Sequence, residues 1–179
     1  MKKILIVILT GMLVACGGGE KPEDEGIFPY SIQQTKLENG LNVVTVPFDS
    51  PGIAAFYIVV RVGSRNEIEE GKTGFAHFFE HMMFRGTDKY PKAKYQEALK
   101  AIGAAANANT WFDRTVYHMT GNAQMLDKMF ELEADRFMNL NYSEADFKVE
   151  AGAVKGEYTK NYASPYMKLY EKTYSTCFY

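Results

Sequence analysis

The sequence predicts a mixed domain of strands and helices, and three observations support this fold class. Asn39 and Gly40 separate two extended runs, and an Asn-Gly pair in that setting is the strongest short-range signal for a β-hairpin. Beyond it, β-rich segments alternate with segments whose apolar residues recur at helical spacing. The chain has 179 residues, 46% of them hydrophobic, and a net charge of -2, which suits one domain with a core and does not indicate a nucleic-acid-binding protein.

The first 16 residues have the pattern of a secretory signal. Lys2 and Lys3 precede an apolar run, residues 4–14, that is too short to span a bilayer as a helix. The Leu-Val-Ala-Cys sequence that ends at Cys16 resembles a bacterial lipoprotein box, which implies cleavage before Cys16 and a lipid on its sulfur. A plain signal peptide with a chance cysteine is the alternative, but the chain has only 2 cysteines.

Residues 17–30 are predicted to form a flexible acidic tether, because they are rich in Gly, Glu and Asp. The folded domain is then expected over residues 31–179. Together with the lipid on Cys16, this organisation predicts a protein anchored to a membrane of the bacterial cell envelope, on the periplasmic side.

The remaining elements are predicted in order along the chain. A β-rich run at 53–62 has apolar residues on both faces, as expected of a buried central strand. Pro91 starts a helix over 92–102, and its inner face carries apolar residues at helical spacing: Tyr95, Ala98, Leu99 and Ile102. Two strands at 107–110 and 115–120 are predicted to form a hairpin.

Two further helices follow this hairpin. Asn122 can cap a long amphipathic helix that runs to residue 140, with large residues on its inner face at positions 126, 129, 130, 133 and 137. Ser143 and Asp146 form a start similar to a capping box for a third helix, which ends near residue 162, before Pro165.

The candidate functional residues lie in a predicted short helix within residues 74–91. His77, Glu80 and His81 are its only ionisable residues before Arg85, and Gly86 stops the helix. Positions i, i+3 and i+4 share a helical face, so both imidazoles and the carboxylate point the same way. The rest of the helix is almost entirely apolar, which predicts that the helix is buried and that these polar residues need partners.

This spacing predicts a zinc site, because two imidazoles one turn apart can bind a single ion. The order His-x-x-Glu-His is the inverse of the commoner zinc protease motif His-Glu-x-x-His. Glu80 lies between the histidines, where it could take a proton from water and pass it to a leaving amine. The alternative reading makes His77 and His81 buried helix histidines and Glu80 an ordinary helix former.

A catalytic zinc ion usually takes three protein ligands, so one ligand lies outside the motif. Glu150 and Glu157 are seven residues apart on the predicted third helix, which is two turns, and so they lie on one face. Either could be the third ligand. His118, which is the remaining histidine, and several other acids are equally possible from spacing alone.

These segments resemble the pitrilysin and insulinase family of zinc peptidases, which includes the mitochondrial processing peptidase. The resemblance covers nearly everything after the tether, in segments 37–41, 63–67, 74–87, 107–110, 115–117 and 147–150, and at Glu157. It implies that His77 and His81 are zinc ligands, that Glu80 is the general base and that Glu157 is the third ligand. Glu150 would be an acid that orients one of the ligands.

The resemblance also implies how substrate binds and how the domain is built. Asn107 and Ala108 fall on the family's edge strand, which pairs with the backbone of the substrate peptide. Asn109 stands where the family commonly has an aromatic residue, so the side-chain preference of this strand is open. The fold implied is an α/β sandwich, with a mostly antiparallel sheet and helices packed on one side.

Family members build a chamber from two or four such domains, so a second domain or a partner subunit is expected. Tyr179 comes before even the first such domain would be complete. The function implied is that of a zinc endopeptidase acting on extended or unfolded peptides. The alternative is a catalytically silent peptide-binding or scaffolding subunit, against which the intact set of His77, Glu80, His81 and Glu157 argues, because silent members usually lose part of it.

The lipid anchor can be tested directly. Metabolic labelling with a fatty acid should mark the wild-type protein and not Cys16→Ser, because the sulfur of Cys16 is the expected attachment point. Equal labelling of both proteins would contradict the prediction.

Overall fold

The computed structural model describes residues 28–178, and the chain divides into two compact units between Asp49 and Ser50. In the first unit, β1 (Gln33–Lys36) and β2 (Asn42–Thr45) form the antiparallel hairpin that Asn39 and Gly40 predict. Gly40 has a φ of 89°, which suits glycine in this turn. The predicted signal segment and Cys16 lie outside the described residues.

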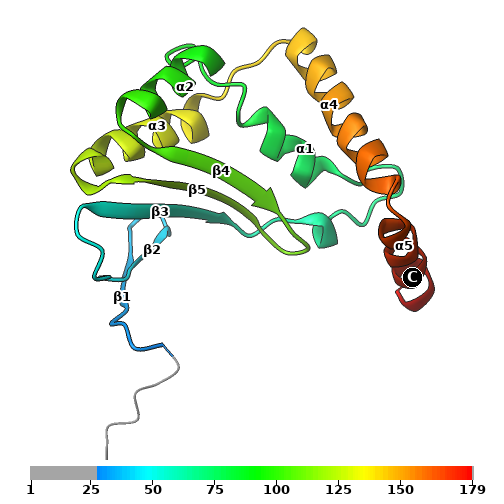
Figure 1. Ribbon diagram of the computed structural model, residues 1–179, viewed down its shortest axis with the longest axis horizontal. Helices are drawn as coiled ribbons and strands as arrows, with labels where there is room; N and C mark the ends of the chain where they lie inside the picture. Colours follow the sequence, from blue (N-terminus) through cyan, green and yellow to red (C-terminus); the bar gives the residue numbers. More distant parts are fainter. Residues whose placement is uncertain (1–27, 179) are drawn as a thin grey trace, which may run out of the picture. The chain divides into compact units, whose positions relative to one another are not determined.

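The second unit is built on a three-stranded antiparallel sheet with the strand order β3-β5-β4. Its strands are β3 (Ile53–Val60), β4 (Ala105–Thr110) and β5 (Thr115–Asn122). Three helices lie on one side of this sheet, namely α1 (Phe75–Met82), α2 (Lys92–Ala101) and α3 (Leu126–Asn139) (Figure 1). The predicted fold class, an antiparallel sheet with helices packed on one side, is confirmed.

The core lies between the sheet and the helices α2 and α3. Met119 from β5 and Met129 and Leu132 from α3 are almost completely buried, and Tyr95 and Leu99 from α2 pack against them. Ala98 and Ile102 lie beside this cluster, so the predicted inner face of the 92–102 helix is confirmed.

The strand β3 differs from the prediction of a buried central strand. Among the described residues it pairs only with β5 and therefore lies at an edge of the sheet. Phe56 packs against the core, whereas Tyr57 and Val59, on the opposite face, are more than half exposed. Apolar residues on both faces predict burial on both, but here the helix side of β3 packs against the core and the opposite side stays largely exposed.

The helix α1 is fixed at its N-terminus by the loop that precedes it. The carboxylate of Glu67 accepts hydrogen bonds from the backbone N–H groups of Gly74 and Ala76, at 2.5 and 2.6 Å. These donors have no partner within the helix, and a negative charge at this end also interacts favourably with the helix dipole. Gly74 has a φ of 94°, a conformation that favours glycine.

Gly86 ends the segment that follows α1, and its φ is 98°. A side chain there would meet the backbone of Tyr90, so the position requires glycine on two grounds. The helix itself is less buried than predicted, because Phe75 and Phe79 are 47% and 49% exposed. Its buried residues, Ala76 and Met82, show that only one stripe of α1 is covered.

Two more helices complete the chain. α4 (Glu144–Tyr162) begins at the predicted capping box, in which the Oγ of Ser143 accepts the N–H of Asp146 and the carboxylate of Asp146 accepts the N–H of Ser143, both at 3.1 Å. α5 (Pro165–Cys177) adds to the predicted elements. Pro165 ends one helix and starts the next, because the first turn needs no N–H donor from it.

None of the helices in the described region combines the length and the apolar character that a membrane span needs.

A buried ion pair in α3 connects the core to the segment after α1. Arg136 and Glu133, each 2% exposed, form this pair, and the hydroxyl of Tyr95 donates to Glu133 at 2.9 Å. The guanidinium of Arg136 also lies 4.8 Å from the ring centre of Phe84 and 5.0 Å from that of Tyr117. Arg136 therefore contacts α2, β5 and the segment after α1.

We expect Arg136→Leu to lower the free energy of unfolding by about 3–5 kcal/mol, because Glu133 would remain buried without its partner. The double variant Glu133→Leu/Arg136→Leu removes both charges and should be more stable than Arg136→Leu alone. Urea unfolding of the wild type and of both variants measures this. If the double variant is no more stable than Arg136→Leu, the lost stability comes from the lost packing of Arg136 on the aromatic rings and not from the unpaired charge of Glu133.

Candidate metal centre

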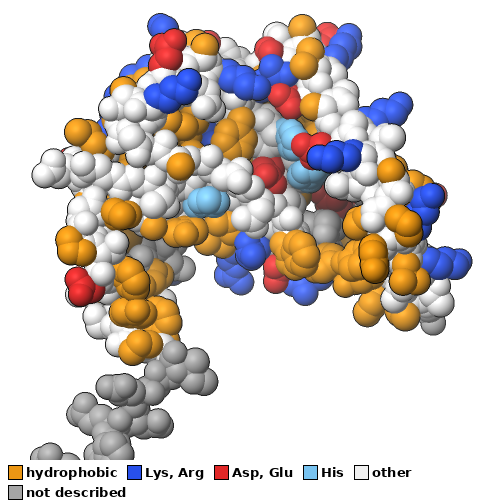
Figure 2. Space-filling model, viewed as in Figure 1, with side chains coloured by type: hydrophobic (Ala, Val, Ile, Leu, Met, Phe, Trp, Pro, Cys, Tyr) orange, Lys and Arg blue, Asp and Glu red, His pale blue; other side chains and the backbone are white. Residues whose placement is uncertain are grey.

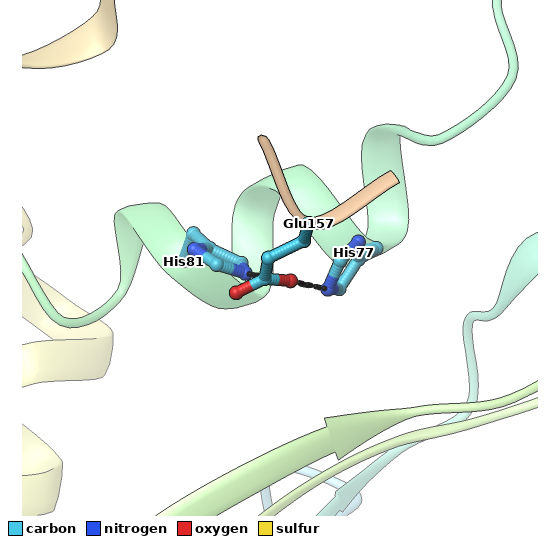
Figure 3. A group of neighbouring side chains, drawn as sticks. All are labelled: His77, His81 and Glu157. Atoms are coloured by element: carbon cyan, nitrogen blue, oxygen red, sulfur yellow. Dashed lines mark hydrogen bonds and ion pairs between the residues drawn. The ribbon is translucent and has the colours of Figure 1, made fainter. Parts of the chain in front are cut away.

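The structure brings His77, His81 and Glu157 together from two different helices. The histidines lie one turn apart on α1, and Glu157 reaches them from α4, which packs against α1 (Figure 3). The two Nε2 atoms are 3.3 Å apart, and each lies 3.6 Å from the Oε2 of Glu157. Ligand atoms from the three residues all lie within 4.8 Å of one another.

These separations fit a tetrahedral metal ion. Two donors that bind zinc at 2.0–2.1 Å, at a tetrahedral angle, lie about 3.3–3.4 Å apart. The lone pairs of two imidazole nitrogens at 3.3 Å repel each other unless a proton or a cation lies between them. Two nitrogens and one carboxylate oxygen also form a ligand set that zinc uses in catalytic sites, where a fourth position stays open.

The group is accessible from solvent on one side. The side chains of His77 and Glu157 are 42% and 51% exposed, whereas that of His81 is 19% exposed. Figure 2 shows histidine and acidic side chains together at the surface, over α1 and α4. The open side of the group is therefore accessible to molecules in solution.

Glu150 lies behind His81 on α4 and is not one of the three grouped residues. Its Oε2 is 3.3 Å from the Nδ1 of His81, and its Oε1 is 2.8 Å from the Nε of Arg85, as an ion pair without hydrogen-bond alignment. A hydrogen bond donated by Nδ1 to this carboxylate holds the tautomer in which Nε2 is free to bind a metal. Glu150 is buried, so its charge needs Arg85 beside it.

Arg85 connects this pair to the start of α4. Its guanidinium lies 3.3 Å from the carboxylate of Asp146 and also donates to the backbone carbonyl of that residue. Hydrogen bonds from Ser143, with a smaller contribution from the charge of Arg85, lower the pKa of Asp146. The sequence patterns did not assign Arg85 a role. Its signal is that it is the first positive charge after the apolar run of α1.

Glu80 lies on α1 between the two histidines in sequence, and its carboxylate is held from the sheet. The hydroxyl of Thr110, on β4, donates to Oε2 of Glu80 at 2.5 Å. Tyr117 is nearby on β5. Burial raises its pKa to about 12, with the charge of Arg136 opposing the rise and that of Glu80 adding to it. No sequence pattern indicated Thr110, because a strand threonine has no distinctive spacing.

The strand β4 lies beside α1 at the other edge of the sheet and pairs only with β5 among the described strands. Asn107 and Ala108 lie on it, so their strand has one unpaired edge. Ala108 and Thr110 are partly buried on the helix side, and Asn109 is exposed and accepts a hydrogen bond from Arg114 at 3.1 Å.

His118 lies apart from the metal-binding group. It stacks on Tyr57 of β3 with 5.6 Å between ring centres, and Tyr57 belongs to the sheet face that the helices leave exposed. Since Tyr117 and Met119, its neighbours, face the helices, His118 points to the opposite side. Spacing alone leaves Glu150, Glu157, His118 and several other acids open as the third ligand, and the structure places Glu157 beside the two histidines.

Comparisons with known proteins identify the family of this chain. The family model described as Insulinase (Peptidase family M16) matches residues 43–178. The "Zinc protease PqqE" of Helicobacter pylori is 35% identical over 150 residues, which are 82% of this chain and 33% of that protein. The "Mitochondrial-processing peptidase subunit beta" of Rattus norvegicus is 35% identical over 127 residues, 70% of this chain and 25% of that protein.

The fold is also similar to part of several solved protease structures. A protease from Helicobacter pylori superposes with a TM-score of 0.70 and 34% identity, over 74% of this chain and 32% of that one. The periplasmic protease PqqL from Escherichia coli gives a TM-score of 0.71 and 25% identity, over 78% of this chain and 16% of that one. The chain thus spans about a third or less of the length of these relatives. Because the family model matches most of its residues, the chain belongs to the insulinase family of peptidases, peptidase family M16.

Proposed function

We propose that this chain carries the metal site of a zinc-dependent endopeptidase that hydrolyses extended or unfolded peptides. The observation that carries the proposal is the meeting of His77, His81 and Glu157 at separations that fit a tetrahedral ion. Relatives named as zinc proteases support a peptidase at the level of the family. The activity of the whole protein is part of the proposal, because the chain covers only a part of those relatives.

Each residue of the site then has one task. Zinc held by His77, His81 and Glu157 would supply Lewis-acid activation of water and of the scissile carbonyl. Glu80 accepts a proton from the attacking water and returns it to the leaving amine. Glu150 accepts a hydrogen bond from the Nδ1–H of His81 and so keeps the imidazole in the orientation that exposes Nε2.

The free edge of β4 is the proposed binding surface for the peptide. An extended peptide could pair with the backbone at Asn107 and Ala108 as an added strand, which gives affinity through main-chain hydrogen bonds. Main-chain pairing depends little on sequence, so it favours extended peptides of many sequences. Because α1 packs on β4, a peptide bound there lies next to the helix that carries Glu80.

We also propose a partner and a location. A second domain of this kind, or a partner subunit, would complete the substrate chamber; the rat relative is itself named as a subunit. A lipid on Cys16 would hold the protein at the bacterial envelope, and the similar Escherichia coli protease is described as periplasmic. The lipid rests on sequence alone, because Cys16 lies outside the described residues.

The third ligand can be tested by metal content. Glu157→Gln should lower bound zinc sharply in a metal assay, because it removes a charged oxygen that lies 3.6 Å from both Nε2 atoms. His118→Ala is the matched control and should retain about one zinc ion per chain, as expected for one site with three protein ligands. The reverse result would place the third ligand on β5.

A substitution at Glu80 can distinguish a defect in catalysis from a defect in metal binding. Glu80→Gln keeps the size of the side chain and removes the basic oxygen, so zinc should stay bound while peptide cleavage falls by about 10²–10⁴. Cleavage of an unfolded peptide should stop with a chelator and return with added zinc. If the zinc-loaded wild type, together with its partner subunit, cleaves no faster than Glu80→Gln, the protein is instead a silent peptide-binding subunit.

A further inference from the structure

We propose that Thr110 is a positioning residue that orients the carboxylate of Glu80 and ties it to the strand that binds the substrate. The inference rests on the proposed function, because it takes Glu80 as the general base. It concerns a contact between α1 and β4 that is independent of the metal-binding atoms. The hydroxyl of Thr110 and the carboxylate of Glu80 are 2.5 Å apart, and both residues are partly buried.

The direction of this hydrogen bond follows from which of the two groups can donate a proton. An ionised carboxylate only accepts hydrogen bonds, so the single hydroxyl proton of Thr110 points to Oε2 of Glu80. Thr115, the cross-strand neighbour of Thr110, has its Oγ1 3.4 Å away. The proton of Thr115 goes to the backbone carbonyl of Val62 at 2.9 Å, because a carbonyl also only accepts. The two hydroxyls therefore do not compete for Glu80.

This arrangement leaves the two carboxylate oxygens of Glu80 with different surroundings. Oε2 accepts the hydrogen bond from Thr110, and Oε1 has no hydrogen-bond partner among residues 28–178. Oε1 is then the oxygen that takes a proton when the O–H bond of the attacking water breaks. Thr110 keeps its own proton throughout, so it orients the base without taking part in the transfer.

The contact also links the base to the substrate. Thr110 lies two residues beyond Ala108 on the same strand, and alternate residues of β4 face the same side. Ala108 and Thr110 are therefore on the helix side, while the backbone of β4 offers its free edge to a peptide. A peptide that pairs with β4 is placed against the strand that also fixes Glu80. The register of the peptide then sets the distance from its scissile carbonyl to the base.

Two substitutions isolate the hydroxyl. Thr110→Val keeps the branched shape and removes the donor, and Thr110→Ser keeps the donor. Both are made in the zinc-loaded protein with its partner subunit, in the wild-type background and in Glu80→Gln. Thr115→Val is the matched control, because it removes a neighbouring strand hydroxyl that donates to Val62 and not to Glu80. The measured quantities are kcat, KM and zinc affinity.

We expect Thr110→Val to lower kcat about 10–100-fold, the range for losing one hydrogen bond to a charged group. KM and zinc affinity should not change, and Thr110→Ser should restore most of the rate. In the Glu80→Gln background Thr110→Val should have no further effect, because residues that act as a unit are not additive. An equal fall in both backgrounds, a parallel loss of zinc, or an equal fall in Thr115→Val would overturn the proposal.

A second measurement needs neither metal nor activity. In nuclear magnetic resonance spectra of the metal-free protein, the hydroxyl proton of Thr110 should exchange slowly with water and should exchange quickly in Glu80→Ala. Fast exchange in both would show that the bond is absent and would refute the positioning role. A third outcome is a hydroxyl proton that exchanges slowly in a wild type that cleaves no faster than Glu80→Gln. That result would confirm the contact between Thr110 and Glu80 and would refute only the proposed peptidase function.

Discussion

The contact of α1 with α4 on one side and with β4 on the other is the constraint on which the site depends. Through α4 it brings Glu157 to the two histidines, and through β4 it holds Glu80 by the hydroxyl of Thr110. The position of α1 is itself fixed at both ends. Glu67 binds its first N–H groups, and Gly86 turns the chain back toward Tyr90. A short helix that is only partly covered needs these connections, because few of its side chains are buried.

The polar groups around the site form two separate networks with different tasks. One runs from His81 to Glu150, Arg85 and Asp146, and it orients an imidazole from the side away from solvent. The other runs from Glu80 to Thr110, and it orients a carboxylate from the sheet. The separation has a physical value, because His81 and Glu80 can each be held in place without sharing a donor or an acceptor. The exposed sides of His77 and Glu157 face solvent.

Much of the fold could be predicted from local signals. The Asn39-Gly40 turn, the capping box at Ser143 and the inner face of the 92–102 helix all occur where their residue patterns place them. The exceptions share one cause. β3 is an edge strand rather than a central one, and α1 is half exposed rather than buried, because the number of partners around an element is set by the tertiary fold. The sequence predicts Pro165 only as the end of a helix, whereas it also starts α5.

The sequence by itself determined that His77, Glu80 and His81 share one face of a helix, since that follows from 3.6 residues per turn. It also limited the third member of the group to a few candidates, Glu150, Glu157 and His118 among them. Only the tertiary structure decided which of these meets the histidines, because the choice depends on how α4 lies against α1. The same holds for Arg85 and Thr110, whose partners are distant in sequence. Helical periodicity is local and can be read along the chain, whereas contacts between elements depend on packing across the whole unit.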